Sequence, residues 1–150
     1  MDTKQESANL ILKLYELRRE ETMRKARTWF TRFDPQSAQD VMNAMMNEET
    51  SAYLRMVTTY WEMAASLVNN GAVDEKMFND ANGEHVFVFA KLQPILGELR
   101  QVFDSPQAFA HLERLVMNMP DAQERLDKMR ERFKLMARMR GEAASKREQV

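Results

Sequence analysis

Glycine and proline are scarce in this chain, with four of each in 150 residues. These two residues mark most turns, so their scarcity leaves few places where the chain can reverse direction. Between those places, apolar residues recur at spacings of three and four, which is typical of one face of an α-helix. The sequence therefore predicts an all-α fold without a sheet. We expect one domain over residues 1–150, a helical bundle of six to seven helices in which the first and last are long.

Short local signals set the expected helix boundaries. Asp34, Asp74 and Asp104 can each cap a helix, because a carboxylate accepts hydrogen bonds from the first backbone N–H groups. Asn69-Asn70-Gly71 is a stop signal, since glycine readily adopts the left-handed backbone that follows a last turn. We expect helices over residues 3–33, 35–46, 48–68, shortly after Asp74, over 84–103 with a kink at Pro94, over 106–118, and from Pro120-Asp121 onward, with residues 141–150 as a frayed tail.

The segment His85–Ala90 is ambiguous, because its β-branched and aromatic residues also suit a strand. A strand without a partner would leave its backbone groups unpaired, and no partner strand can be identified elsewhere in the sequence. Val86, Phe89 and Leu92 also share a helical face. We therefore predict a helix here.

Composition removes several classes of protein. The chain has no cysteine, which excludes disulfides, thiolate metal sites and cysteine nucleophiles. Its longest apolar runs fall short of the roughly 18–20 residues that a membrane-spanning helix needs. The first ten residues are polar and lack the pattern of a signal peptide. We therefore expect a cytoplasmic protein.

Charge is unevenly distributed along the chain. Residues 34–113 hold 12 acidic and 4 basic residues, whereas residues 1–33 and 114–150 are both basic on balance. One interpretation is that basic terminal helices pack beside acidic central ones; the other is that a basic face contacts an acidic partner, a membrane surface or nucleic acid. The candidate basic surface consists of Arg18, Arg19, Arg24, Lys25, Arg27 and Arg32. The domain is slightly acidic overall and shows no helix-turn-helix spacing, so we do not expect direct nucleic-acid binding.

No catalytic or cofactor-binding motif is present. The two histidines, His85 and His111, lack metal-ligand spacing, and we expect both at the surface or its boundary. The four scattered glycines form no phosphate-binding or dinucleotide-binding loop. We therefore predict a non-enzymatic protein without metal or other cofactor.

Two apolar features are candidate binding sites. Leu126, Met129, Phe133 and Met136 form a coiled-coil-like stripe on the last helix, and the first helix is its natural partner, within one chain or in a second copy. We favour a homodimer that acts through protein–protein contacts. Membrane-surface contact, which such a stripe beside arginines also suits, is not expected.

The thirteen methionines are either core filling or an adaptable binding surface. If they form a binding surface, the protein is a sensor or regulator that binds an apolar small molecule between helices. Its pocket would then be lined by Met45, Trp61, Met63 and Phe89.

Three stretches occur in an order that resembles a family of small bacterial helical proteins classed as a domain of unknown function. They are Tyr15–Glu21 leading into Ala26-Arg27, Leu67–Glu75, and Leu92–Leu96 ending at Arg100. The resemblance covers roughly residues 15–105. It implies an all-α fold and supplies no activity, cofactor or catalytic residue. The methionine-rich segment after Pro35 and the basic last helix lie outside what it explains.

Overall fold

The computed structural model describes residues 3–149, which contain α-helices and no strand. The all-α prediction is therefore confirmed for this range, including a helix rather than a strand at 85–90. The helices are more numerous than the six to seven expected, because two of the long ones are interrupted. They are α1 (Thr3–Arg18), α2 (Glu21–Arg32), α3 (Ala38–Met46), α4 (Glu48–Asn69), α5 (Glu75–Ala81), α6 (Glu84–Leu92), α7 (Leu96–Val102), α8 (Ala110–Met117) and α9 (Ala122–Glu148), with a 3₁₀ turn at Gln93–Ile95.

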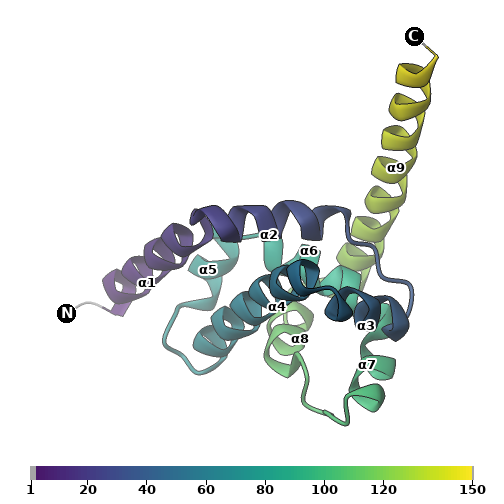
Figure 1. Ribbon diagram of the computed structural model, residues 1–150. Helices are drawn as coiled ribbons and strands as arrows, with labels where there is room; N and C mark the ends of the chain where they lie inside the picture. Colours follow the sequence, from purple (N-terminus) through teal and green to yellow (C-terminus); the bar gives the residue numbers. More distant parts are fainter. Residues whose placement is uncertain (1–2, 150) are drawn as a thin grey trace.

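Helix α4 lies at the centre of the fold and packs against α2, α3 and α8 (Figure 1). It is apolar around most of its circumference, so neighbours can cover it from several sides. Its Trp61 side chain is 1% exposed and packs edge-on against Tyr60 and Phe78. The large core residues from other helices include Phe30 of α2, Phe89 of α6 and Leu112 of α8.

The expected single helix over residues 3–33 is wrong, because the helix is broken between Arg18 and Glu21. The Glu20 side chain accepts hydrogen bonds from the backbone N–H groups of Thr22 and Met23, at 3.0 and 2.9 Å. It thereby caps α2, and these bonds lower the pKa of the Glu20 carboxyl. A new helix thus begins within the charged run Arg18–Glu21, which the sequence pattern predicts to be part of one continuous helix.

Two of the three expected aspartate caps are also corrected. Ser37, not Asp34, caps α3 by accepting a hydrogen bond from the Asp40 N–H at 3.3 Å. Asp104 takes a left-handed backbone with φ of 48°, and α8 begins only at Ala110. The third prediction is confirmed, since Asp74 caps α5 through a 2.9 Å hydrogen bond from the Met77 N–H.

The stop at Asn69-Asn70-Gly71 and the interruption at Pro94 are confirmed. Helix α4 ends at Asn69, and Gly71 has a φ of 83°, a conformation that suits glycine. Between α6 and α7 the chain forms the short 3₁₀ turn that contains Pro94. Proline lacks the N–H that a continuous α-helix needs, so the interruption lies where the sequence predicts it.

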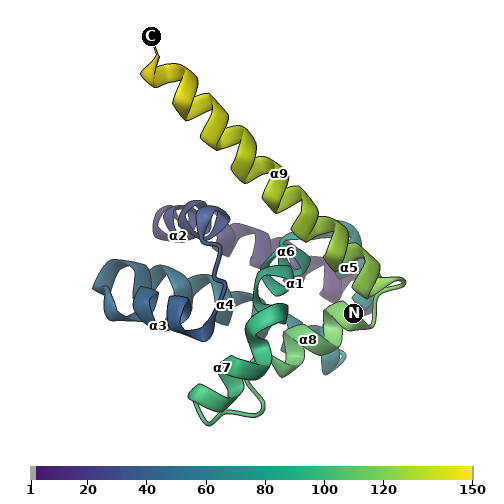
Figure 2. The same cartoon turned by 90° about the vertical axis from the view of Figure 1, so that its right-hand side faces the viewer.

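The first half of α9 crosses α6 and contacts α8, and the second half projects away from the other helices (Figures 1 and 2). The pairing of the first and last helices within the chain, which we expected as one alternative, does not extend along the helices. Within the described range, only the end of α2 approaches α9, where Thr31 and Arg32 line a pocket together with Met136 and Arg140. Residues 141–148, which we expected to fray, are helical, and Val150 lies outside the described residues.

Candidate interaction surface

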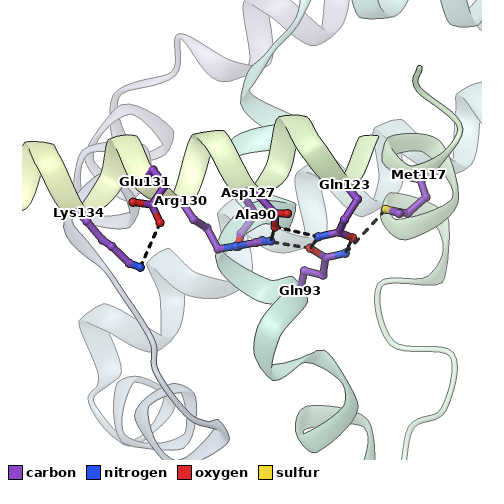
Figure 3. Close-up of polar contacts among 8 residues, drawn as sticks. All are labelled: Ala90, Gln93, Met117, Gln123, Asp127, Arg130, Glu131 and Lys134. Carbon is purple, nitrogen blue, oxygen red and sulfur yellow. Dashed lines mark hydrogen bonds and ion pairs between the residues drawn. The ribbon is translucent and has the colours of Figure 1, made fainter. Parts of the chain in front are cut away.

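A set of polar contacts fixes the first half of α9 to the end of α6 (Figure 3). Arg130 donates hydrogen bonds to the Ala90 carbonyl at 3.0 Å and to Gln93 Oε1 at 3.1 Å. Its second terminal nitrogen lies 2.6 Å from Asp127 Oδ1, which holds the guanidinium in position. Gln123 and Gln93 donate to each other's side-chain oxygens at 3.2 and 2.8 Å. These directional bonds from several residues fix the orientation of the base of α9, defined here as residues 122–133.

Apolar contacts secure the same half of the helix. Leu126 is fully buried, and Met129 and Phe133 are partly buried against the core. The Phe133 ring packs edge-on against Phe87 of α6, with 4.8 Å between the ring centroids. Three of the four residues of the expected dimer stripe thus contact their own chain, and only Met136 remains exposed.

Beyond Phe133, α9 becomes an exposed arm, defined here as residues 134–148. Every residue of this arm is exposed, and it includes three large apolar side chains, Leu135, Met136 and Met139. At about 1.5 Å per residue the arm is roughly 20 Å long. A helical segment of this length has marginal stability when nothing packs against it. The arm is therefore a candidate contact surface.

Lys91 connects α6, α2 and the base of α9. Its ammonium group donates to the carbonyl oxygens of Phe30, Thr31 and Phe33, at 2.8, 2.9 and 2.5 Å, at the end of α2. It also lies 5.3 Å from the centroid of the Phe133 ring. Burial lowers the pKa of Lys91 to about 8. Sequence reasoning missed this residue, although a lysine within an otherwise apolar helix is a signal of a buried role.

The six residues of the expected basic surface do not form one surface. Arg18 and Arg27 both contact the largely buried side chain of Glu84 in α6. Arg27 Nε donates to the two carboxylate oxygens at 3.0 and 2.9 Å, and Arg18 Nη1 lies 3.6 Å from Oε2. These two arginines are therefore engaged within the fold.

The other four basic residues remain outside that ion-pair cluster. Arg24, Lys25 and Arg32 line a groove beside Trp29 and Tyr53, and Arg19 lies over the Tyr15 ring at 5.7 Å. The groove also contains three acidic residues, Glu21, Asp34 and Glu49. The groove thus has equal numbers of basic and acidic side chains. Its charge therefore does not favour an anionic ligand.

The expected apolar pocket of four residues is not brought together. Trp61 and Phe89 fill the core, at 1% and 0% exposed, and Met63 is exposed on α4. Met45 lines a pocket of about 220 Å³ whose other walls come from α4, α6, α7 and the loop before α8. Of the four residues predicted to line one pocket, only Met45 lines this one, and its neighbours there are different residues.

His85 differs from the expected surface position, because its side chain is fully buried beside Trp61 and Phe78. Its Nε2 lies 2.9 Å from Asn79 Oδ1. Burial, with a smaller contribution from the nearby Arg18 charge, lowers the pKa of His85 to about 4. The buried imidazole is therefore neutral at ordinary pH.

Within residues 3–149, no group of three or more His, Cys, Asp or Glu side chains is placed to hold a metal ion. None of the helices in the described range combines the length and apolar character needed to cross a membrane.

Comparison with curated proteins and with solved structures gives no significant match. A family model does match, over residues 5–119, which include almost all of α1 and the whole of α2–α8. Helix α9 lies outside that match. The match confirms the resemblance drawn from Tyr15 to Arg100 and extends it in both directions. The chain therefore belongs to the family described as Domain of unknown function (DUF4760).

Proposed function

We propose that this protein is a non-enzymatic, cytoplasmic adaptor that acts through protein–protein contacts, and that the arm of α9 is its contact surface. The observation that carries the proposal is the contrast between an anchored base and a projecting, fully exposed arm. A helix held by Arg130 and Leu126 at one end presents its other end in a defined direction.

The outer face of the arm is not covered by residues 3–149 of its own chain. Successive helical residues are rotated by about 100°, so Leu135 lies about 200° around the helix from Phe133, which faces α6. Met139 follows Leu135 by four residues and shares its face. These two side chains are 49% and 54% exposed. Covering them requires a second molecule.

We propose a second copy of this chain as that molecule, which makes the protein a homodimer. The arm carries five basic residues and two acidic ones, whereas residues 34–113 hold 12 acidic and 4 basic residues. The basic arm of one copy therefore complements the acidic central helices of the other. In a symmetric dimer the same contact is made twice.

The test is sedimentation equilibrium of the full chain and of the variant Leu135→Glu/Met139→Glu. We expect the unmodified protein to be dimeric at micromolar concentration, and the variant to be monomeric because two charges would be desolvated in the contact. Raising the salt concentration should weaken the dimer, since it screens the charge complementarity.

Ala144→Glu is the matched control. This residue is also exposed on the arm and lies nine residues after Leu135, about half a turn around the helix. It should leave the dimer intact. If the unmodified protein sediments as a monomer at high concentration, or if Ala144→Glu dissociates it as strongly, a dimer through the outer face is excluded.

A second candidate function is supported by the pocket that Met45 lines. Its walls are mostly apolar, and it lies between helices, where ligand sites are common. In this alternative the protein is a sensor or regulator that binds an apolar small molecule. The pocket belongs to the region covered by the family model, whereas the arm does not. The two functions can therefore be tested separately.

A further inference from the structure

The 220 Å³ pocket has an apolar interior. Leu54 of α4, Leu92 of α6 and Leu99 of α7 are buried around it, and Phe103 and Phe109 line it from the loop that joins α7 to α8. An apolar cavity of about 150 Å³ is large enough to hold benzene. This pocket can therefore hold an aliphatic or aromatic group slightly larger than benzene.

Two polar side chains with unused hydrogen-bond donors line the same pocket. Arg55 is exposed, and its Nε donates to the Ser51 carbonyl at 3.3 Å. Its terminal nitrogens make no ion pair with any described residue, and the Ser105 hydroxyl has no hydrogen-bond partner in the same range. The other hydroxyl of the lining, that of Thr58, already donates to the Leu54 carbonyl at 2.8 Å.

The loop beside the pocket is held in an uncommon conformation. Asp104 and Phe109 have φ values of 48° and 60°, a region that costs energy for residues other than glycine. The loop is held from outside the pocket, because Arg100 Nε donates to the Ala108 carbonyl at 3.0 Å and Nη2 contacts Glu113 at 3.1 Å. Glu62 of α4 accepts hydrogen bonds from the first N–H groups of α8, at 3.2 and 2.8 Å. The fold thus maintains this wall of the pocket at an energetic cost.

We infer that the pocket binds a small amphipathic carboxylate, such as a medium-chain fatty acid. Its alkyl chain would occupy the apolar interior, and its carboxylate would accept hydrogen bonds from the Arg55 guanidinium and the Ser105 hydroxyl. Arg55 is the one charged residue of the pocket lining, so its charge favours an anion over a cation. This inference rests on the second candidate function and specifies the class of its ligand.

The test is isothermal titration calorimetry of the full chain with octanoate, octanol and octylamine. We expect octanoate to bind best, octanol more weakly and octylamine least. Arg55→Gln should weaken octanoate binding about fivefold, the size expected for one exposed ion pair, and leave octanol unchanged. Leu99→Phe should reduce the binding of both by filling the cavity.

Arg114→Gln is the matched control, since Arg114 is an exposed arginine on α8 that does not line the pocket. It should leave octanoate binding unchanged. Arg55 is exposed, so its variant tests binding even if Leu99→Phe fails to fold. Equal binding of octanoate and octanol, with no effect of Arg55→Gln, overturns the carboxylate inference and leaves the apolar sensor standing. Absence of binding by every probe overturns both.

Discussion

The two halves of α9 have similar sequences and different environments. Each mixes apolar residues with arginines and lysines, and the stripe Leu126, Met129, Phe133, Met136 runs from one half into the other. In the first half this stripe is packed against the core, and in the second half Met136 is 52% exposed. The pattern thus predicts a helix equally well in both halves. Which half of α9 is buried depends on how far α6 and α8 extend along it. The sequence of α9 itself carries no information about that extent.

Replacing Leu126 by alanine should give the largest difference between the halves. Leu126 is fully buried, so Leu126→Ala should lower the free energy of unfolding by about 2–5 kcal/mol. Leu135→Ala removes the same atoms from a side chain that its own chain leaves exposed. At protein concentrations low enough for the chain to be monomeric, it should change the free energy of unfolding by less than about 0.5 kcal/mol. Urea unfolding followed by circular dichroism measures both. Equal losses would show that the arm is packed against the rest of the chain.

Lowering the pH should destabilise the core, because His85 is buried there. The same effect is not expected for the arm, which contains no histidine. The unfolded chain takes up a proton near pH 6.5, whereas burial keeps folded His85 neutral until about pH 4. Stability should therefore fall as pH decreases through this window, by on the order of 3 kcal/mol in total.

Urea unfolding at several pH values measures this dependence for the unmodified chain and for His85→Gln. The variant should show a shallower slope between pH 6.5 and about 4. An unchanged slope would assign the acid sensitivity to carboxylates instead.

Arg130→Met removes the polar attachment of the base. The Ala90 carbonyl and Gln93 would lose their hydrogen bonds from the guanidinium, and the free energy of unfolding should fall by about 1–3 kcal/mol. Arg138→Met is the control on the exposed arm, and it should have almost no effect on unfolding. If the two variants unfold alike, the contacts of Arg130 do not hold α9.

Gly141→Ala should have the smallest effect on global unfolding. Gly141 lies within helical α9, and an added Cβ would meet nothing within 4 Å. Alanine should therefore stabilise the arm locally by roughly 0.5–1 kcal/mol. Amide hydrogen exchange should show slower exchange after residue 134 and an unchanged urea midpoint. A higher midpoint would indicate that arm and core unfold together.

Short-range signals in the sequence predicted several boundaries correctly. Asp74 caps α5, Gly71 follows α4, and Pro94 interrupts the helix that begins at Glu84, because each effect acts within a few residues. Predictions failed where competing local bonds decide the outcome. Glu20 begins a new helix inside a charged run, and Ser37 rather than Asp34 caps α3.

The candidate sites depended on contacts between distant residues. The sequence predicts Arg18 and Arg27 to be part of a basic surface, whereas in the structure both form ion pairs with Glu84. It likewise predicts Leu126 to be an interface residue, whereas Leu126 is buried in the core. Glu62 caps α8 from about fifty residues away, which no local pattern reveals. Likewise, the pocket joins Met45 to a loop at 103–109 whose conformation the sequence does not suggest.

The sequence alone determined that the chain is all-α and where several helices begin and end, because hydrophobic periodicity and capping are local properties of the backbone. Only the tertiary structure decided which charges are paired, which half of α9 is buried, and which apolar residues share a pocket. These outcomes depend on which surfaces meet, since an exposed and a buried leucine have the same helical periodicity and differ only in what packs against them.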